Sequence, residues 1–229
     1  MDRAAHVGAH LEAVGHGAVP THLEGVESGA DFARRHAAHA SFGDRVFAVP
    51  AALAPLLPGG GLERGHVYAC RGEASLSLVC CLVADASRHG SWVGLVGVES
   101  LGLMCASDAG VALERLVRID IDEGAPWAHV VGACVEGIDI VVVARPRCTA
   151  HDARRIEARV KAHGGVLVVL GDAGAFSAHV VLSSRTVRWD FTTHAARRTV
   201  HVRADGRRSR ADAVAHMVLP DDARTVAAR

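Results

Sequence analysis

Two amino acids are missing from this chain of 229 residues, which contains neither asparagine nor glutamine, and Lys161 is its single lysine. Any mechanism that needs a side-chain amide, or a lysine at another position, is therefore excluded. The heavy use of Ala, Arg, Val and Gly suggests a GC-rich genome, in which arginine replaces lysine without a functional cause. Part of the lysine scarcity is thus a matter of composition.

Long apolar runs are missing as well. No stretch approaches the roughly 18 to 20 uninterrupted apolar residues that span a bilayer, and the start of the chain has no charged-then-apolar leader. We therefore expect a cytoplasmic protein that does not bind a membrane. Hydrophobic residues make up 50% of the chain, which is enough for the core of one α/β domain.

Net charge and paired cysteines are also lacking. The 25 basic residues balance 25 acidic ones, so the chain has little generic attraction for polyanions, and strong autonomous binding of nucleic acid is not expected. None of the 6 cysteines forms a CxxC pair, and most lie in apolar runs, where a cysteine behaves as a small buried hydrophobe. We expect reduced structural thiols.

Histidine is abundant, with 15 residues, yet the sequence predicts no metal site. Among close pairs, only His6 and His10 have the i, i+4 spacing that places two side chains on one side of a helix. No nearby cysteine or glutamate completes a plausible zinc ligand set. Solvated histidines on an N-terminal arm are the expectation, with a metal site as the alternative.

The order of segments predicts one α/β domain with two extensions. Residues 1–45 are expected to form a helical arm, 46–203 the core, and 204–229 a tail with a short helix at Ala211–Val218. Core strands are predicted at His66–Cys70, Trp92–Val98, Leu116–Ile121, Ile138–Val143 and Val166–Leu170. Core helices are predicted at Ser75–Ala86, Leu101–Gly110, Trp127–Glu136 and Ala150–Ala162.

This alternation indicates the fold class: α/β, with a doubly wound and mostly parallel sheet. After the last helix the pattern changes to strands joined by turns. They are expected at His179–Ser183, Val187–Phe191 and Arg198–Arg203. We expect these strands to be antiparallel and to extend one edge of the sheet.

The turn after the first core strand is where such folds hold phosphate, in a loop of the form GxxxxGK[ST]. Here Gly72 is present, but Ser77 stands at the second glycine, Leu78 at the lysine, and Val79 at the hydroxyl that holds Mg²⁺. Leucine cannot neutralise phosphate, and valine cannot bind a hard cation. Gly72, Ser77, Leu78 and Val79 therefore constitute a degenerate phosphate loop, and no nucleotide cofactor is expected.

The metal side of the site is missing too. A buried strand in such a fold ends on an aspartate that orients Mg²⁺, whereas here the strand ends in Ala144. Glu99 follows a predicted strand, and without a bound phosphate we expect it to be an ordinary solvated residue.

These segments resemble the RecA core. Gly65–Tyr68 leading into Gly72, then Leu95–Glu99, then Asp139–Val143 follow its order and spacing over roughly residues 50–185. Within that superfamily the chain resembles the actinobacterial ImuA-type proteins, through Leu56–Leu62, Gly90–Trp92 and Leu101–Leu103.

The resemblance implies a RecA-like fold without ATPase activity and a non-catalytic role in damage-induced mutagenesis. In that role the chain would bind an ImuB-like inactive Y-family polymerase and join the translesion mutasome of the SOS response. The sliding clamp and an error-prone DNA polymerase would be reached through that partner, which fits the missing glutamine that bacterial clamp-binding peptides use. The complex would be associated with the nucleoid, and self-association is left open.

Two alternatives stay open. One is a working NTPase with an unorthodox loop, in which arginines such as Arg71 hold phosphate. The other is a weak direct contact with DNA, or with a partner, through an arginine patch. That patch would comprise Arg145, Arg147, Arg154, Arg155, Arg207, Arg208 and Arg210.

Overall fold

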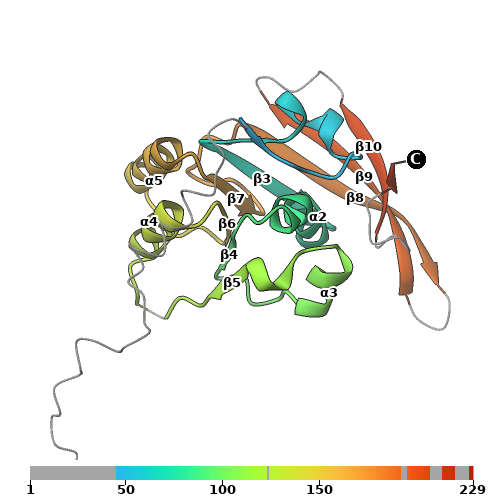
Figure 1. Cartoon of the computed structure of the whole chain (residues 1–229), viewed down its shortest axis with the longest axis horizontal. Helices are drawn as coiled ribbons and strands as arrows, with labels where there is room; N and C mark the ends of the chain where they lie inside the picture. The colour runs from blue at the N-terminus through green and yellow to red at the C-terminus, as the bar shows by residue number, and fades with distance from the viewer. Residues whose placement is uncertain (1–44, 123, 192–194, 207–212, 220–226, 229) are drawn as a thin grey trace, which may run out of the picture.

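A computed structural model describes residues 45–122, 124–191, 195–206, 213–219 and 227–228 (Figure 1). Most of the arm predicted at residues 1–45 therefore lies outside the described residues. Among those described, no helix is both long and apolar enough to cross a membrane.

One sheet of 9 strands forms the centre of the molecule, in the order β11-β10-β9-β8-β3-β7-β6-β4-β5. All neighbouring pairs from β8 to β5 in this order are parallel. Beyond β8, the strands β9, β10 and β11 each pair antiparallel with the strand before them. Their bounds are β3 His66–Gly72, β4 Val93–Val96, β5 Leu116–Ile119, β6 Ile140–Ala144, β7 Val166–Leu170, β8 Val180–Phe191, β9 Ala195–Gly206, β10 Val214–Leu219 and β11 Ala227–Ala228. The predicted class, a mostly parallel α/β sheet with antiparallel strands at one edge, is confirmed.

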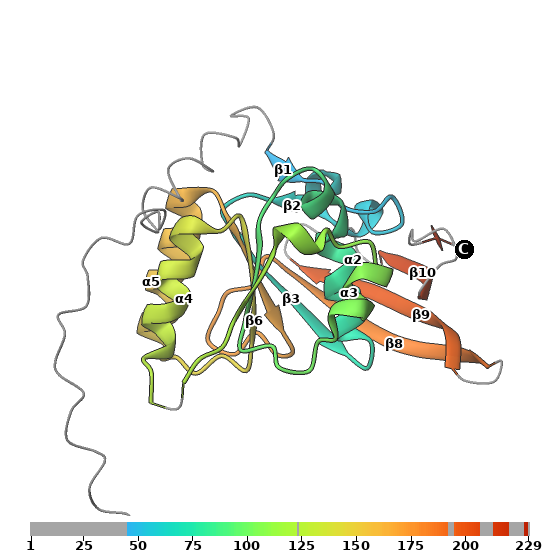
Figure 2. The ribbon, with the colours of Figure 1, turned by 60° about the horizontal axis from the view of Figure 1, so that its bottom comes forward.

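Helices cover the parallel strands on both faces (Figures 1 and 2). They are α2 Ser75–Arg88, α3 Leu103–Asp108, α4 Trp127–Gly137 and α5 Ala150–His163, with a 3-10 turn at Leu113–Arg115. Successive strand residues point to opposite faces, so β3 contributes Tyr68 and Cys70 to the α2 core but Val67 and Ala69 to the α4 and α5 core. Because both faces are buried, the sequences of the parallel strands are nearly continuous apolar runs.

A small subdomain precedes the sheet. Strands β1 (Val46–Phe47) and β2 (Leu62–Glu63) pair antiparallel, and two 3-10 turns, Ala54–Leu56 and Pro58–Gly60, lie between them. Its leucines are buried in the same core as α2. The sequence predicted only an apolar segment and a turn here.

Two predictions at the C-terminal side are wrong. The strands expected at His179–Ser183 and Val187–Phe191 are one continuous strand, β8, because Ser184 and Arg185 pair with β9 with no turn between them. The helix expected at Ala211–Val218 is wrong from Val214 onward, since these residues form β10 along the edge of β9. Met217 is fully buried there, so the core reaches past the predicted boundary at residue 203.

The contact between β3 and β8 requires a glycine. Gly72 pairs with Ser184 and has a φ of +101°, a left-handed value that side chains other than glycine rarely adopt. A Cβ on Gly72 would lie 1.9 Å from the backbone oxygen of Ser184. The last residue of β3 therefore cannot carry a side chain while β8 stays in place.

We expect Gly72→Ala to destabilise the fold by on the order of 3 kcal/mol, because it combines backbone strain with a steric clash against a strand. Gly90→Ala is the matched control: its φ is +94°, but no atom lies within 4 Å of the added Cβ. It should cost only about 1–2 kcal/mol. Chemical denaturation of both variants measures the difference, and equal losses would contradict the close approach of β8.

Candidate functional site

The helix after β3 begins inside the segment where a phosphate loop would lie. Only Glu73 and Ala74 separate β3 from α2, and the Leu78 amide already donates to the Ala74 carbonyl at 2.8 Å. Ser77, at the position of the second loop glycine, is thus helical. A phosphate loop needs these residues as an open turn whose amides surround the ligand, and that turn is not formed here.

Ser184 of β8 takes up the polar groups at this turn. Its Oγ accepts a hydrogen bond from the Ala74 amide at 3.2 Å and donates to the Arg71 carbonyl at 3.0 Å. The Glu73 carboxylate is held by the Thr186 amide at 3.1 Å. The Ala74 amide, at the position where such a loop would bind phosphate, is therefore bonded within the protein.

Arg198 of β9 reaches the first turn of α2. Its guanidinium donates to the Ser77 hydroxyl and lies over the Trp189 ring, 5.3 Å from the centroid. Burial lowers the pKa of Arg198. A guanidinium nevertheless keeps its proton in proteins at neutral pH, so the side chain stays a cation. A positive charge thus lies at the helix start, but it comes from β9 and bonds to the protein itself.

The side chains at the lysine and hydroxyl positions belong to the core. Leu78 is 0% exposed and Val79 is 2% exposed, within the core between α2 and the sheet. The next two residues of the helix are the buried thiols Cys80 and Cys81, and burial raises the pKa of Cys81 to about 12. All four side chains are enclosed in the core and are not presented to a ligand.

The other predicted positions lie along the same edge of the sheet, since the parallel strands all end there. Ala144 ends β6 and pairs with Leu170, while Glu99 follows β4 and is exposed. No carboxylate stands at the end of β6 to orient a metal ion.

The described arginines of the predicted patch are all exposed. Arg145 and Arg147 follow β6, and Arg154 and Arg155 lie in the first half of α5. Arg145 has a φ of +48°, which is uncommon for a residue other than glycine. The structure brings these four to one region, whereas Arg207, Arg208 and Arg210 lie outside the described residues.

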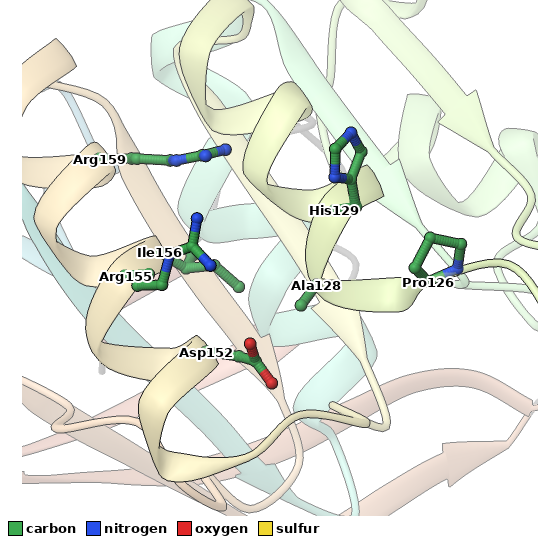
Figure 3. A pocket seen from close by; sticks show the side chains of 7 residues that line it. All are labelled: Pro126, Ala128, His129, Asp152, Arg155, Ile156 and Arg159. Atoms are coloured by element: carbon green, nitrogen blue, oxygen red, sulfur yellow. The ribbon is translucent and has the colours of Figure 1, made fainter.

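A cleft of about 200 Å³ opens beside this patch, between α4 and α5 (Figure 3). Arg155 and Arg159 line it from α5, facing His129 of α4. Asp152, also in the lining, forms a capping box with Thr149, whose hydrogen bonds lower the pKa of the Asp152 carboxyl. Arg159 pairs with Glu136 at 3.1 Å. The cleft is thus partly occupied by internal ion pairs and helix capping.

Sequence reasoning missed Ser184 and Arg198. Both come from strands far along the chain from the phosphate-loop position, and no local pattern marks them. The one available signal was Gly72 itself, because a glycine at the end of a strand indicates a close backbone approach.

Comparison with known proteins agrees with this architecture. The sequence model of the MT3502 N-terminal domain matches residues 55–175, which is more than half of the 229 residues. The chain belongs to the family of the MT3502 N-terminal domain. The match begins in the small subdomain and ends after β7, so the antiparallel strands of this family member lie outside it.

Two individual proteins are similar to this member of the MT3502 N-terminal domain family. The uncharacterized protein Rv3395c of Mycobacterium tuberculosis is 32% identical over 130 residues, which make up 55% of this chain and 62% of Rv3395c. The chain thus matches less than two thirds of that relative's length. The crystal structure of the RadB recombinase superposes with a TM-score of 0.54 at 14% identity, over 76% of this chain and 95% of RadB. This likeness shows that the fold is RecA-like.

We expect Leu78→Lys to destabilise the protein by about 3–5 kcal/mol, because it buries an ammonium group without a partner charge. It should not create a nucleotide site, since the loop residues before it are helical. Leu78→Met, which keeps the volume and the apolar character, should cost less than about 1.5 kcal/mol. Thermal melting compares the two, and a Leu78→Lys variant that melts with the wild type would contradict the buried position.

Proposed function

We propose that this protein is a non-catalytic RecA-like accessory factor of the ImuA type, which acts in translesion DNA synthesis by binding an ImuB-like partner. The observation that carries the first half of the proposal is the turn between β3 and α2. Its Ala74 amide is bonded to Ser184, its second-glycine position is helical, and its lysine position is a buried leucine.

The chemistry of that turn opposes ATP hydrolysis at each step. Phosphoryl transfer needs amides and a cation around the β and γ phosphates, and a metal ion held by a hydroxyl and a carboxylate. The corresponding positions are Leu78, Val79 and Ala144. The arginines at this turn bond within the protein: Arg198 donates to the Ser77 hydroxyl, and Arg71, next to Gly72, donates to the Ser183 hydroxyl at 2.9 Å. Rebuilding the cradle would require α2 to unwind and β8 to move.

We expect no binding of Mg-ATP in the micromolar range and no release of phosphate above a blank. Titration calorimetry with the full chain tests this, with a RecA protein that has an intact phosphate loop as the positive control. Saturable micromolar binding would overturn the non-catalytic half of the proposal. It would favour the NTPase with an unorthodox loop.

The partner half of the proposal is supported by the ImuA-type sequence resemblance and by an exposed apolar surface. Trp189 and Phe191, two residues apart in the outer half of β8, are 45% and 69% exposed, and Val187, at a register shift in the β8–β9 pairing, is 58% exposed. The Trp189 and Phe191 rings contact each other, with centroids 6.2 Å apart. Exposed aromatic pairs of this kind are typical of binding surfaces, because aromatic residues supply much of the energy of protein interfaces.

The position of this surface is set by the direction of β8. The strand runs parallel to β3 and continues past the Gly72–Ser184 pair, so its end projects beyond the parallel half of the sheet (Figure 2). Trp189 pairs with Arg198, whose side chain contacts α2, so the ring lies on the α2 face. We call Trp189 and Phe191 the β8 stripe.

Helix α3 adds a second apolar group on the same face. Leu103 and Met104 are 55% and 73% exposed in its first turn, and α3 follows the end of β4 at the same edge as the β8 stripe. Ala106 holds α3 against the core that contains α2. Both groups lie on the α2 side of the sheet, toward the edge where RecA-like proteins carry their nucleotide loop. We assign the ImuB-like partner to this side, with the β8 stripe as its main contact.

We expect the double variant Trp189→Ala with Phe191→Ala to weaken binding of an actinobacterial ImuB-type protein at least about tenfold, since each aromatic anchor is worth about 1–2 kcal/mol. Leu113→Ala, which removes an apolar side chain 39% exposed near β5, is the matched control and should bind as the wild type does. Surface-binding titrations give both affinities. Equal affinity of the double variant and the wild type would exclude the β8 stripe.

Weak contact with DNA is a second candidate, favoured by the exposed arginines that follow β6. Arg145, Arg147, Arg154 and Arg155 lie near one another, but Asp152 is among them and no tryptophan or tyrosine of the described residues is interleaved as a stacking platform. Such a patch would hold phosphates without reading sequence. It would add to a complex that the partner assembles.

A further inference from the structure

A cluster of three potential metal ligands lies at the edge of the sheet opposite the phosphate-loop position. Glu63 ends β2, His66 begins β3, and His179 immediately precedes β8. One nitrogen or oxygen from each lies within 4.8 Å of the other two, and all three residues are partly buried. Because β3 and β8 are parallel, their first residues meet at this edge.

The backbone holds the three residues in register. The His179 amide donates to the Val67 carbonyl at 2.6 Å, which fixes the start of β8 beside the start of β3. The Glu63 amide donates to the Tyr68 hydroxyl at 2.8 Å, which ties β2 to the same strand. The ligand groups thus come from three segments that the fold itself positions.

The hydrogen bonding of His66 favours a ligand role. Its Nδ1 lies 3.0 Å from the Arg64 carbonyl, which can only accept, so Nδ1 carries the proton and Nε2 presents a lone pair. A backbone carbonyl on the second ring nitrogen is the arrangement that orients metal-bound histidines in many proteins. The tautomer of His66 needed for a metal is therefore fixed in advance.

The other two ligands already face each other. His179 Nε2 and Glu63 Oε2 are 3.0 Å apart, and the His66 and His179 rings are in contact with centroids 4.2 Å apart. Bonds of about 2.0–2.1 Å to a tetrahedral ion place its ligands about 3.3 Å from one another. Closing the cluster onto an ion therefore needs only small side-chain rotations.

We propose that Glu63, His66 and His179 bind a zinc ion, with water as the fourth ligand. Two imidazoles and a carboxylate form a donor set that suits zinc, whereas calcium and magnesium take oxygen ligands. Zinc binds the neutral imidazole, so any proton on Nε2 of His179 is released to solvent when the ion binds. The ion joins the small subdomain, the start of β3 and the start of β8, so its role is to hold the N-terminal edge of the sheet together.

Zinc binding is tested with the full chain, prepared without a histidine tag, by competition with a chromophoric chelator. The histidines at residues 1–44 add weak sites, so the measurement is the difference between variants. We expect Glu63→Gln and His66→Ala each to weaken the tightest zinc site more than about tenfold, since even second-shell changes cost 10–100-fold. The wild type should also melt at a lower temperature after chelation, and the variants should not.

The matched control is the double variant His201→Ala with His216→Ala. These residues form another close imidazole pair, with ring centroids 5.0 Å apart, but among the described residues no third potential ligand completes a metal site with them. The control should keep the tight site and its chelator-dependent melting. Glu63→Gln preserves the side-chain volume, so it decides the outcome if His66→Ala does not fold. Equal zinc affinity in the wild type and Glu63→Gln, or an equal loss in the control, would overturn the proposal.

Discussion

The pairing of β8 with β3 is the contact on which the rest of the structure depends. It joins the parallel half of the sheet to the antiparallel half, and it is closest at Gly72, where only a glycine leaves room for the Ser184 backbone. The same serine bonds the Ala74 amide and the Arg71 carbonyl. The strand pairing that attaches the C-terminal strands to the sheet therefore also occupies the polar groups at the phosphate-loop position.

Burial replaces ligand binding as the source of order at the start of α2. In a nucleotide-binding relative the polar groups of this turn are satisfied by phosphate and metal, so the turn must stay open. Here Leu78 and Val79 add apolar area to the core, and polar groups from β8 and β9 satisfy the turn. Replacing Leu78 or Val79 by a polar residue would remove buried apolar contacts. It would not open the turn, because the neighbouring residues are part of the helix.

The sequence was informative where the determining contacts are local. The alternation of buried strands and helices predicted β3 to β7 with small errors at the ends, and Ser77, Leu78 and Val79 lie in α2, which begins at Ser75. The errors lie where partners are distant: β10 forms because β9 offers an unpaired edge, and β8 is continuous because β9 pairs along it. The contacts of Ser184 and Arg198, and the meeting of Glu63, His66 and His179, follow from topology and have no local sequence pattern.

Under the proposed function, the two ends of the parallel strands have different roles. A RecA-like protein with a working phosphate loop changes its surface when nucleotide binds, because the loop and the ends of the strands respond to the ligand. A chain without that loop has no nucleotide-dependent state, and a ligand shifts an equilibrium only by binding one state better than the other. The proposed function therefore assigns control of this protein to partner binding at the exposed edge that carries the β8 stripe, while the opposite edge is closed by the small subdomain.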